Sequence, residues 1–291
     1  EIIERAIPKL FKNGKTGTHI GISSLRKPWE KGVARNVKRS ITALNSPFFA
    51  IDSFHSDFDV VDKPKWFEGL LEWKDIKEYA LFHFKVTVKD NQIVNLVYEF
   101  TPWASMPKLS ERKVFFQKSD SEKNDENAWD SLSLGEKLAK TYSLLEDNDG
   151  KFALSNHKIG EIVFEGYIFD RDPFVLRLGV SDKKGFKEYL NNNTGVRVFR
   201  DGMRIYDYGE PENDWLDLNI RRVNEPGKKL SNNIILGAIY LKRLDSADLV
   251  EKTNREGFID DEAYKVFKRT CLYILEVVEA LRYSDKLRLR E

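Results

Sequence analysis

An apolar repeat near the end of the chain constrains the fold more than any other feature. Two acidic residues, Asp261 and Glu262, stand just before the repeat, where negative charge suits the N-terminus of a helix. The sequence therefore predicts a long closing helix that begins near residue 260 and buries one face against a sheet, a second copy of the chain, or a further domain. The repeat follows spacings of three and four residues and consists of Tyr264, Phe267, Cys271, Ile274, Val278 and Leu281.

Runs of β-branched and aromatic residues predict strands between residues 79 and 243. Residues 79–100 form a hairpin around Asp90-Asn91, and residues 196–208 form a tight hairpin around Asp201-Gly202. Further strands are expected at 158–170, 174–180 and 233–243, with a short helix over 181–195. The predicted fold class is α+β.

Three blocks are expected along the chain: 1–48, 49–157 and 158–291. The first combines a strand at 18–25 with a helix within 28–48, whose apolar stripe includes Val33, Val37, Ile41 and Leu44. The second contains a polar segment at 118–131 that is typical of an exposed loop.

Composition excludes several classes of function. The net charge of +1 gives no overall positive field for nucleic acid, and the single cysteine allows no intrachain disulfide. The longest apolar run has eight residues, far fewer than the roughly 20 of a membrane helix. The four histidines lack metal-binding spacing, so no metal site is predicted. We expect a cytoplasmic protein in a reducing compartment.

Two basic stretches near the start of the chain bear on phosphate and nucleic-acid binding. Residues 12–18, "KNGKTGT", lack the first glycine of a phosphate loop. The stretch 26–39 carries six positive charges against Glu30, which favours a solvated helix face over a nucleic-acid patch.

The segment "NREGF" offers an arginine between a strand and a helix. The planar guanidinium of Arg255 could bind phosphate oxygens through two parallel hydrogen bonds. On residue chemistry alone, a surface pair with Asp260 or Asp261 is the favoured alternative.

The sequence around this segment resembles a known superfamily. Residues 195–268, which include "GVRVFRDGMRIYDYGEPENDW" and "EKTNREGFIDDEAYKVFK", are similar to the second half of GHKL-type ATPases, the superfamily of gyrase B, heat-shock chaperones, histidine kinases and MutL. The stretch "GTHIGISSLRKPW" (17–29) resembles the last motif of their nucleotide-binding domain. Within this superfamily the sequence resembles the bacterial histidine kinase-like, heat-shock-chaperone-like ATP-binding proteins.

The resemblance implies two domains with different roles. Residues 1–48 would be the end of an α/β-sandwich nucleotide-binding domain, and residues 158–291 a transducer with a ribosomal-S-five-like βαβ arrangement and a long closing helix. Arg255 would contact the γ-phosphate of ATP, with Lys252 and Asn254 as weaker candidates for the nucleotide. Gly17 and Thr18 match the motif near the adenine.

The chain also departs from that superfamily. The helix that carries the catalytic Glu and the magnesium-binding Asn, and the Asp-x-Gly-x-Gly adenine motif, do not occur in this sequence. By resemblance they lie before residue 1, so ATP and Mg²⁺ are expected in the full-length protein, and this chain alone is expected to bind no cofactor and to be inactive.

Three functional hypotheses remain open. The favoured one is a transducer that couples nucleotide state to domain motion and whose first partner is the missing nucleotide-binding segment. The second is a non-catalytic module that binds nucleic acid or a protein client, with residues 26–39 as the patch. The third is a scaffold that forms a homodimer through the closing helix.

Overall fold

The computed structural model describes residues 26–44, 46, 48, 58–60, 62–117, 154–254 and 256–289. Several predictions concern residues outside these ranges, namely the strand at 18–25, the loop at 118–131, and the site residues Gly17, Thr18 and Arg255.

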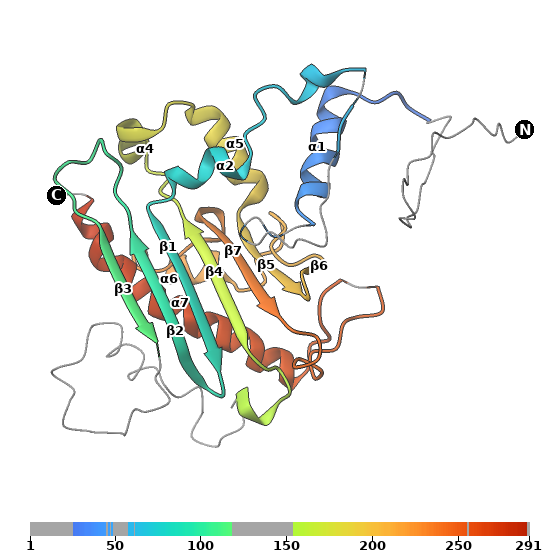
Figure 1. The fold of residues 1–291 in the computed structure, drawn as a ribbon, viewed down its shortest axis with the longest axis vertical. Helices are drawn as coiled ribbons and strands as arrows, with labels where there is room; N and C mark the ends of the chain where they lie inside the picture. The colour runs from blue at the N-terminus through green and yellow to red at the C-terminus, as the bar shows by residue number, and fades with distance from the viewer. Residues whose placement is uncertain are drawn as a thin grey trace, which may run out of the picture.

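A seven-stranded mixed sheet forms the centre of the protein, with the strand order β3-β2-β1-β4-β7-β5-β6 (Figure 1). All neighbouring strands are antiparallel except β5 and β7, which are parallel. The strands are β1 (Phe82–Lys89), β2 (Gln92–Phe100), β3 (Arg112–Gln117), β4 (Ile162–Ile168), β5 (Gly195–Arg200), β6 (Met203–Ile205) and β7 (Ile235–Leu241). The α+β class is therefore confirmed.

The structure also contains helices and short turns. Those described are α1 (Lys31–Thr42), α2 (Trp73–Ile76), α4 (Pro173–Gly179), α5 (Lys183–Asn193), α6 (Leu218–Asn224) and α7 (Glu262–Arg288). Short 3-10 turns lie at Pro64–Phe67, Lys77–Tyr79, Leu154–Asn156 and Asn232–Ile234. In Figure 1, α7 crosses one face of the sheet, whereas α2, α4 and α5 gather at one end of the strands.

The predicted closing helix is confirmed as α7, which begins after Asp261, whose side chain accepts a hydrogen bond from the backbone N–H of Tyr264. Five seam residues from Phe267 to Leu281 are at most 1% exposed and share one core cluster with the strands, and Tyr264 packs against that cluster partly buried. Of the alternatives for the seam, the structure supports packing on the sheet, because these side chains are covered within the chain.

Both predicted hairpins form. Asp90 and Asn91 have φ of +48° and +66°, and Asp201 and Gly202 have φ of +48° and +79°. Positive φ at both central residues is the requirement of a type I′ turn, which matches the twist of the strands on either side.

The strand predicted at 174–180 is wrong, because this segment forms helix α4. Pro173 stands at the first turn, where its missing N–H costs nothing, and the Asp172 side chain accepts a hydrogen bond from the N–H of Phe174. Only part of the run is buried, since Val175 and Leu176 are covered and Phe174 is 54% exposed. The cap decided the structure here, and hydrophobicity misled the prediction.

The helix predicted within 28–48 is confirmed as α1, but its apolar stripe is only partly buried. Val33 is 49% exposed and Leu44 is 45% exposed, whereas Val37 and Ile41 are half-buried and Ala34 is fully buried. Polar contacts also hold the helix: Arg35 donates to the carbonyl oxygens of Trp66 and Glu68, and Arg39 pairs with Glu188 of α5 at 2.6 Å.

Candidate functional site

The segment between β7 and α7 contains a short loop whose two ends pair with each other. We call these paired ends, residues 251–252 and 257–258, the root of the loop. Glu251 and Phe258 form an antiparallel bridge, and the N–H of Lys252 donates to the carbonyl of Gly257 at 2.9 Å. Figure 1 shows this loop on the β6 side of the molecule. We call residues 251–258 the arm loop.

A tyrosine fixes the returning side of the arm loop. The phenol oxygen of Tyr208 accepts a hydrogen bond from the N–H of Phe258 at 2.9 Å. Gly257 has a φ of +84°, and a Cβ there would lie 3.0 Å from the Tyr208 hydroxyl. Burial raises the pKa of Tyr208, so the phenol keeps its proton at neutral pH. Only glycine fits this place without strain.

An arginine fixes both sides of the root. Arg200, the last residue of β5, is 9% exposed and donates to the carboxylate of Glu251 at 3.0 Å. It also donates to the hydroxyl and carbonyl oxygens of Ser246, and its guanidinium lies 5.4 Å from the ring centre of Phe258. The root is thus attached to the sheet through one side chain.

The outer part of the arm loop is polar and exposed. Lys252, Thr253, Asn254 and Glu256 are all exposed. The Asn254 carboxamide donates to the Glu256 carboxylate at 2.7 Å and accepts from the Glu256 N–H at 3.1 Å. Asn254 therefore shapes the turn, and Lys252 extends the polar surface. Arg255 lies between these residues in sequence but outside the described ones.

The same edge of the sheet also contacts the end of α1. Arg204 of β6 donates to the carbonyl of Ala43 at 3.5 Å, while Tyr206, two residues later, forms a parallel bridge with Glu256. In addition, the Ser46 hydroxyl lies 2.5 Å from the hydroxyl of Tyr240 in β7. Residues 204–206 thus contact both the end of α1, through Arg204, and the arm loop, through Tyr206.

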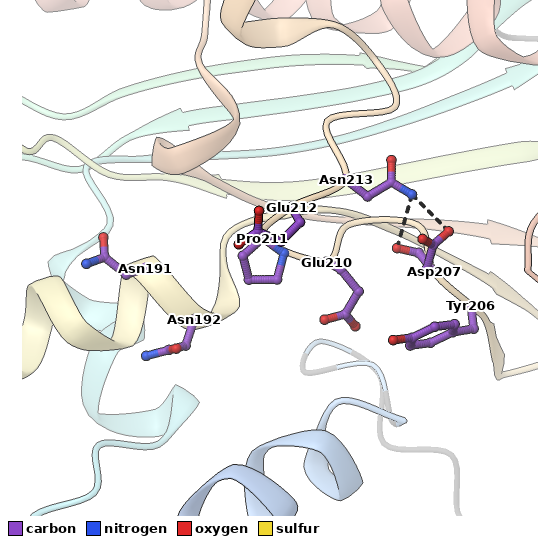
Figure 2. A pocket seen from close by; sticks show the side chains of 8 residues that line it. All are labelled: Asn191, Asn192, Tyr206, Asp207, Glu210, Pro211, Glu212 and Asn213. Carbon is purple, nitrogen blue, oxygen red and sulfur yellow. Dashed lines mark hydrogen bonds between the residues drawn. The ribbon is translucent and has the colours of Figure 1, made fainter.

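A hollow of about 560 Å³ adjoins this edge, between the end of α5 and residues 206–213 (Figure 2). Figure 2 shows Asn191 and Asn192 at one side, Tyr206 at the other, and Glu210 between them, facing the blue ribbon of α1. The hollow is lined by Asn191, Asn192, Tyr206, Asp207, Glu210, Pro211, Glu212 and Asn213.

The charges of this hollow do not suit a phosphate. It includes three carboxylates, of which Glu210 pairs with Arg204 at 2.6 Å and Asp207 accepts from Asn213 at 2.9 Å. A negatively lined hollow repels a triphosphate.

The basic stretch 26–39 makes contacts within the chain. Arg35 and Arg39 are hydrogen-bonded, as described above, and the Lys38 ammonium lies 4.7 Å from the ring centre of Phe67. Three of the six basic side chains on which the nucleic-acid hypothesis depends therefore already have partners within the chain.

Sequence reasoning missed Arg200 and Tyr208, the two residues that fix the arm loop. A signal for Arg200 was present, because the two-residue period of a strand places it on the same face as Val196 and Val198, which belong to the core cluster. A charged residue at an inward position indicates a buried partner. Nothing in the local pattern marks Tyr208, since its partner lies 50 residues away.

One histidine and the cysteine have structural partners or a core position in the described part of the chain. His83 is satisfied by Glu99 at 3.1 Å and Glu165 at 3.3 Å. Cys271 is buried in the core. Among the residues that the structure describes, no three His, Cys, Asp or Glu side chains gather as metal ligands, and no described helix is long and apolar enough to cross a membrane.

The chain matches no protein-family model, and no curated protein or solved structure matches it either.

Proposed function

We propose that the chain is the transducer part of a GHKL-type ATPase. In this proposal the arm loop presents Arg255 to the γ-phosphate of an ATP that is held with Mg²⁺ by a nucleotide-binding segment outside residues 1–291. Lys252 and Asn254 would border the nucleotide, and Gly17 and Thr18 would lie near its adenine. The βαβ unit of the transducer would be the parallel pair β5 and β7 with α6 between them in sequence.

One observation supports this proposal most strongly. The arm loop combines a root that is fixed to buried residues with an exposed polar outer part, on the edge that also contacts the end of α1. A phosphate ligand needs a donor that is held in place but still reaches outside its own domain, because electrostatic stabilisation depends on preorganised groups. Movement of the arm loop toward or away from the nucleotide would then couple ATP to domain position.

The proposal predicts a selective effect of Arg255→Ala in the full-length protein. Arginine contacts to a transferring phosphoryl group act mainly in the transition state, so ATP turnover should fall at least about tenfold. The dissociation constant of ATP should change much less. Steady-state turnover and equilibrium binding of ATP, measured on the same preparations, test this expectation.

Arg177→Ala is the matched control, because Arg177 is an exposed arginine on α4, away from the arm loop. It should leave both quantities unchanged. Equal turnover in Arg255→Ala and wild type would reject the proposed role.

A further inference from the structure

We propose that Arg200 is a positioning residue for the arm loop: it sets the place of the loop relative to the sheet and so acts on ATP turnover through Arg255. This inference rests on the proposed function. Arg200 itself is 9% exposed and would not touch the nucleotide.

The geometry gives Arg200 a contact on each side of the loop. Its Nη1 donates to Glu251 at 3.0 Å, where the chain leaves, and its guanidinium lies 5.4 Å from the ring of Phe258, where the chain returns. Its Nε donates to the hydroxyl of Ser246 at 3.0 Å, ahead of the loop. One rigid group therefore holds three points of the same segment.

The sheet holds Arg200 in turn. Arg200 pairs with Leu241 of β7 on one side and with Met203 of β6 on the other, and the next residue, Asp201, donates its N–H to the carbonyl of Leu241 at 3.0 Å. Because β5 is an inner strand, the sheet fixes the position of the guanidinium. The contacts of the guanidinium then fix the position of the loop relative to the sheet.

The contacts require a guanidinium and not merely a positive charge. A planar fork can donate to a carboxylate and to Ser246 while one face lies on an aromatic ring, whereas an ammonium is a point charge. Arg200→Lys should therefore recover only part of what Arg200→Gln loses.

The test uses the full-length protein and measures kcat and KM for ATP in Arg200→Gln, Arg200→Lys, Arg255→Ala and the Arg200→Gln/Arg255→Ala double variant. We expect Arg200→Gln to lower kcat at least about tenfold, since misplacement of a reacting group by about 1 Å can cost about a hundredfold. KM should be unchanged, and Arg200→Lys should lie between. The double variant should be no slower than Arg255→Ala, because Arg200 acts through that residue.

A second readout reports loop position without ATP. Trypsin cleaves after Lys252, and this cleavage should be severalfold faster in Arg200→Gln than in wild type below the melting temperature. The control is Arg112→Gln, which breaks the ion pair of Arg112 with buried Asp285 on the opposite edge of the sheet. It should reduce stability while leaving kcat and the cleavage rate unchanged.

The outcomes separate the two proposals. If Arg255→Ala keeps full turnover, the proposed function is rejected, and the role of Arg200 in turnover is rejected with it. If Arg255→Ala is slow but Arg200→Gln is normal, or if the two effects multiply, only the positioning role of Arg200 is rejected. A drop in kcat for Arg112→Gln equal to that of Arg200→Gln would also overturn it, since general destabilisation would then explain both.

Discussion

Gly257 allows the arm loop a backbone conformation and a close contact that other residues do not. Its backbone has a φ of +84°, and a methyl group there would lie 3.0 Å from the hydroxyl of Tyr208. The neighbouring Phe258 is 2% exposed and hydrogen-bonded to that same hydroxyl, so the crowded glycine cannot simply move outward. Backbone conformation and packing therefore both select glycine.

Gly257→Ala should lower the free energy of unfolding by about 1–3 kcal/mol, the usual cost of a non-glycine residue held in a sparsely populated backbone region. Urea denaturation followed by circular dichroism measures this. Gly32→Ala in α1 is the control, because a Cβ there has nothing within 4 Å. It should be neutral or stabilising by up to about 1 kcal/mol. Equal stability of the two variants would contradict this account.

The protonation state of Cys271 is determined by its burial in the core. The thiol is 0% exposed, and burial raises its pKa well above the ordinary value, so it remains protonated. The sequence prediction that this cysteine is part of the core is confirmed.

Neighbouring strands share a row of charges on the sheet face opposite α7. Lys113 of β3 pairs with Glu99 of β2, and His83 of β1 lies between Glu99 and Glu165 of β4. Lys85 completes the row at 3.1 Å from Glu165. Such cross-strand pairs stabilise neighbouring strands of a sheet.

This row predicts a pH dependence of stability. Burial alone would raise the pKa of Glu165, but the hydrogen bond from His83 and the charge of Lys85 outweigh burial and hold the pKa below its ordinary value. The folded state therefore binds fewer protons than the unfolded state. The stability that Glu165 contributes is present above the unfolded pKa of about 4.3 and is lost as the pH falls through the lower folded pKa.

Glu165→Gln should accordingly make stability depend less steeply on pH below about pH 5. Urea midpoints between about pH 6 and pH 3 measure the slope. Glu161→Gln, just before β4 and outside the row, should keep the wild-type slope. Parallel curves for wild type and Glu165→Gln would rule out this contribution.

At the scale of the whole molecule, α7 holds the sheet and α6 together. Its buried Asp285 accepts hydrogen bonds from Tyr98 of β2 at 2.7 Å and from Arg112 of β3. Its buried Glu279 pairs with Arg221 of α6 at 3.1 Å and with Lys229 at 3.2 Å. The helix is thus positioned by ionic contacts near its C-terminal half and by its apolar seam along the sheet.

Ile274→Ala in the middle of the seam should lower the free energy of unfolding by about 2–5 kcal/mol, because a fully buried side chain leaves a cavity. Lys265→Ala, which removes only an exposed pair with Glu262, should cost less than about 1 kcal/mol. Urea denaturation and sedimentation velocity together test this. Unchanged stability with a change in particle mass for Ile274→Ala would show instead that the seam joins two copies.

The sequence by itself determined those elements whose signals are local. The type I′ turns at Asp90-Asn91 and Asp201-Gly202, the cap of α7 at Asp261 and the seam of that helix depend on residues within a few positions of one another. Their periodicity or turn chemistry leaves few alternatives. The arm loop was also singled out from its residues, although its central Arg255 lies outside the described ones.

Tertiary structure decided the features that join distant residues. Helix α4 is an exception, because its cap at Asp172 is a local signal that the prediction overlooked. Helix α6 was not predicted because its few apolar residues give no clear period. The attachment of the arm loop joins Arg200 to Glu251 and Tyr208 to Phe258, pairs about 50 positions apart. No local pattern encodes such a pair, because the chain must first fold into the β5–β7 edge before these side chains can meet.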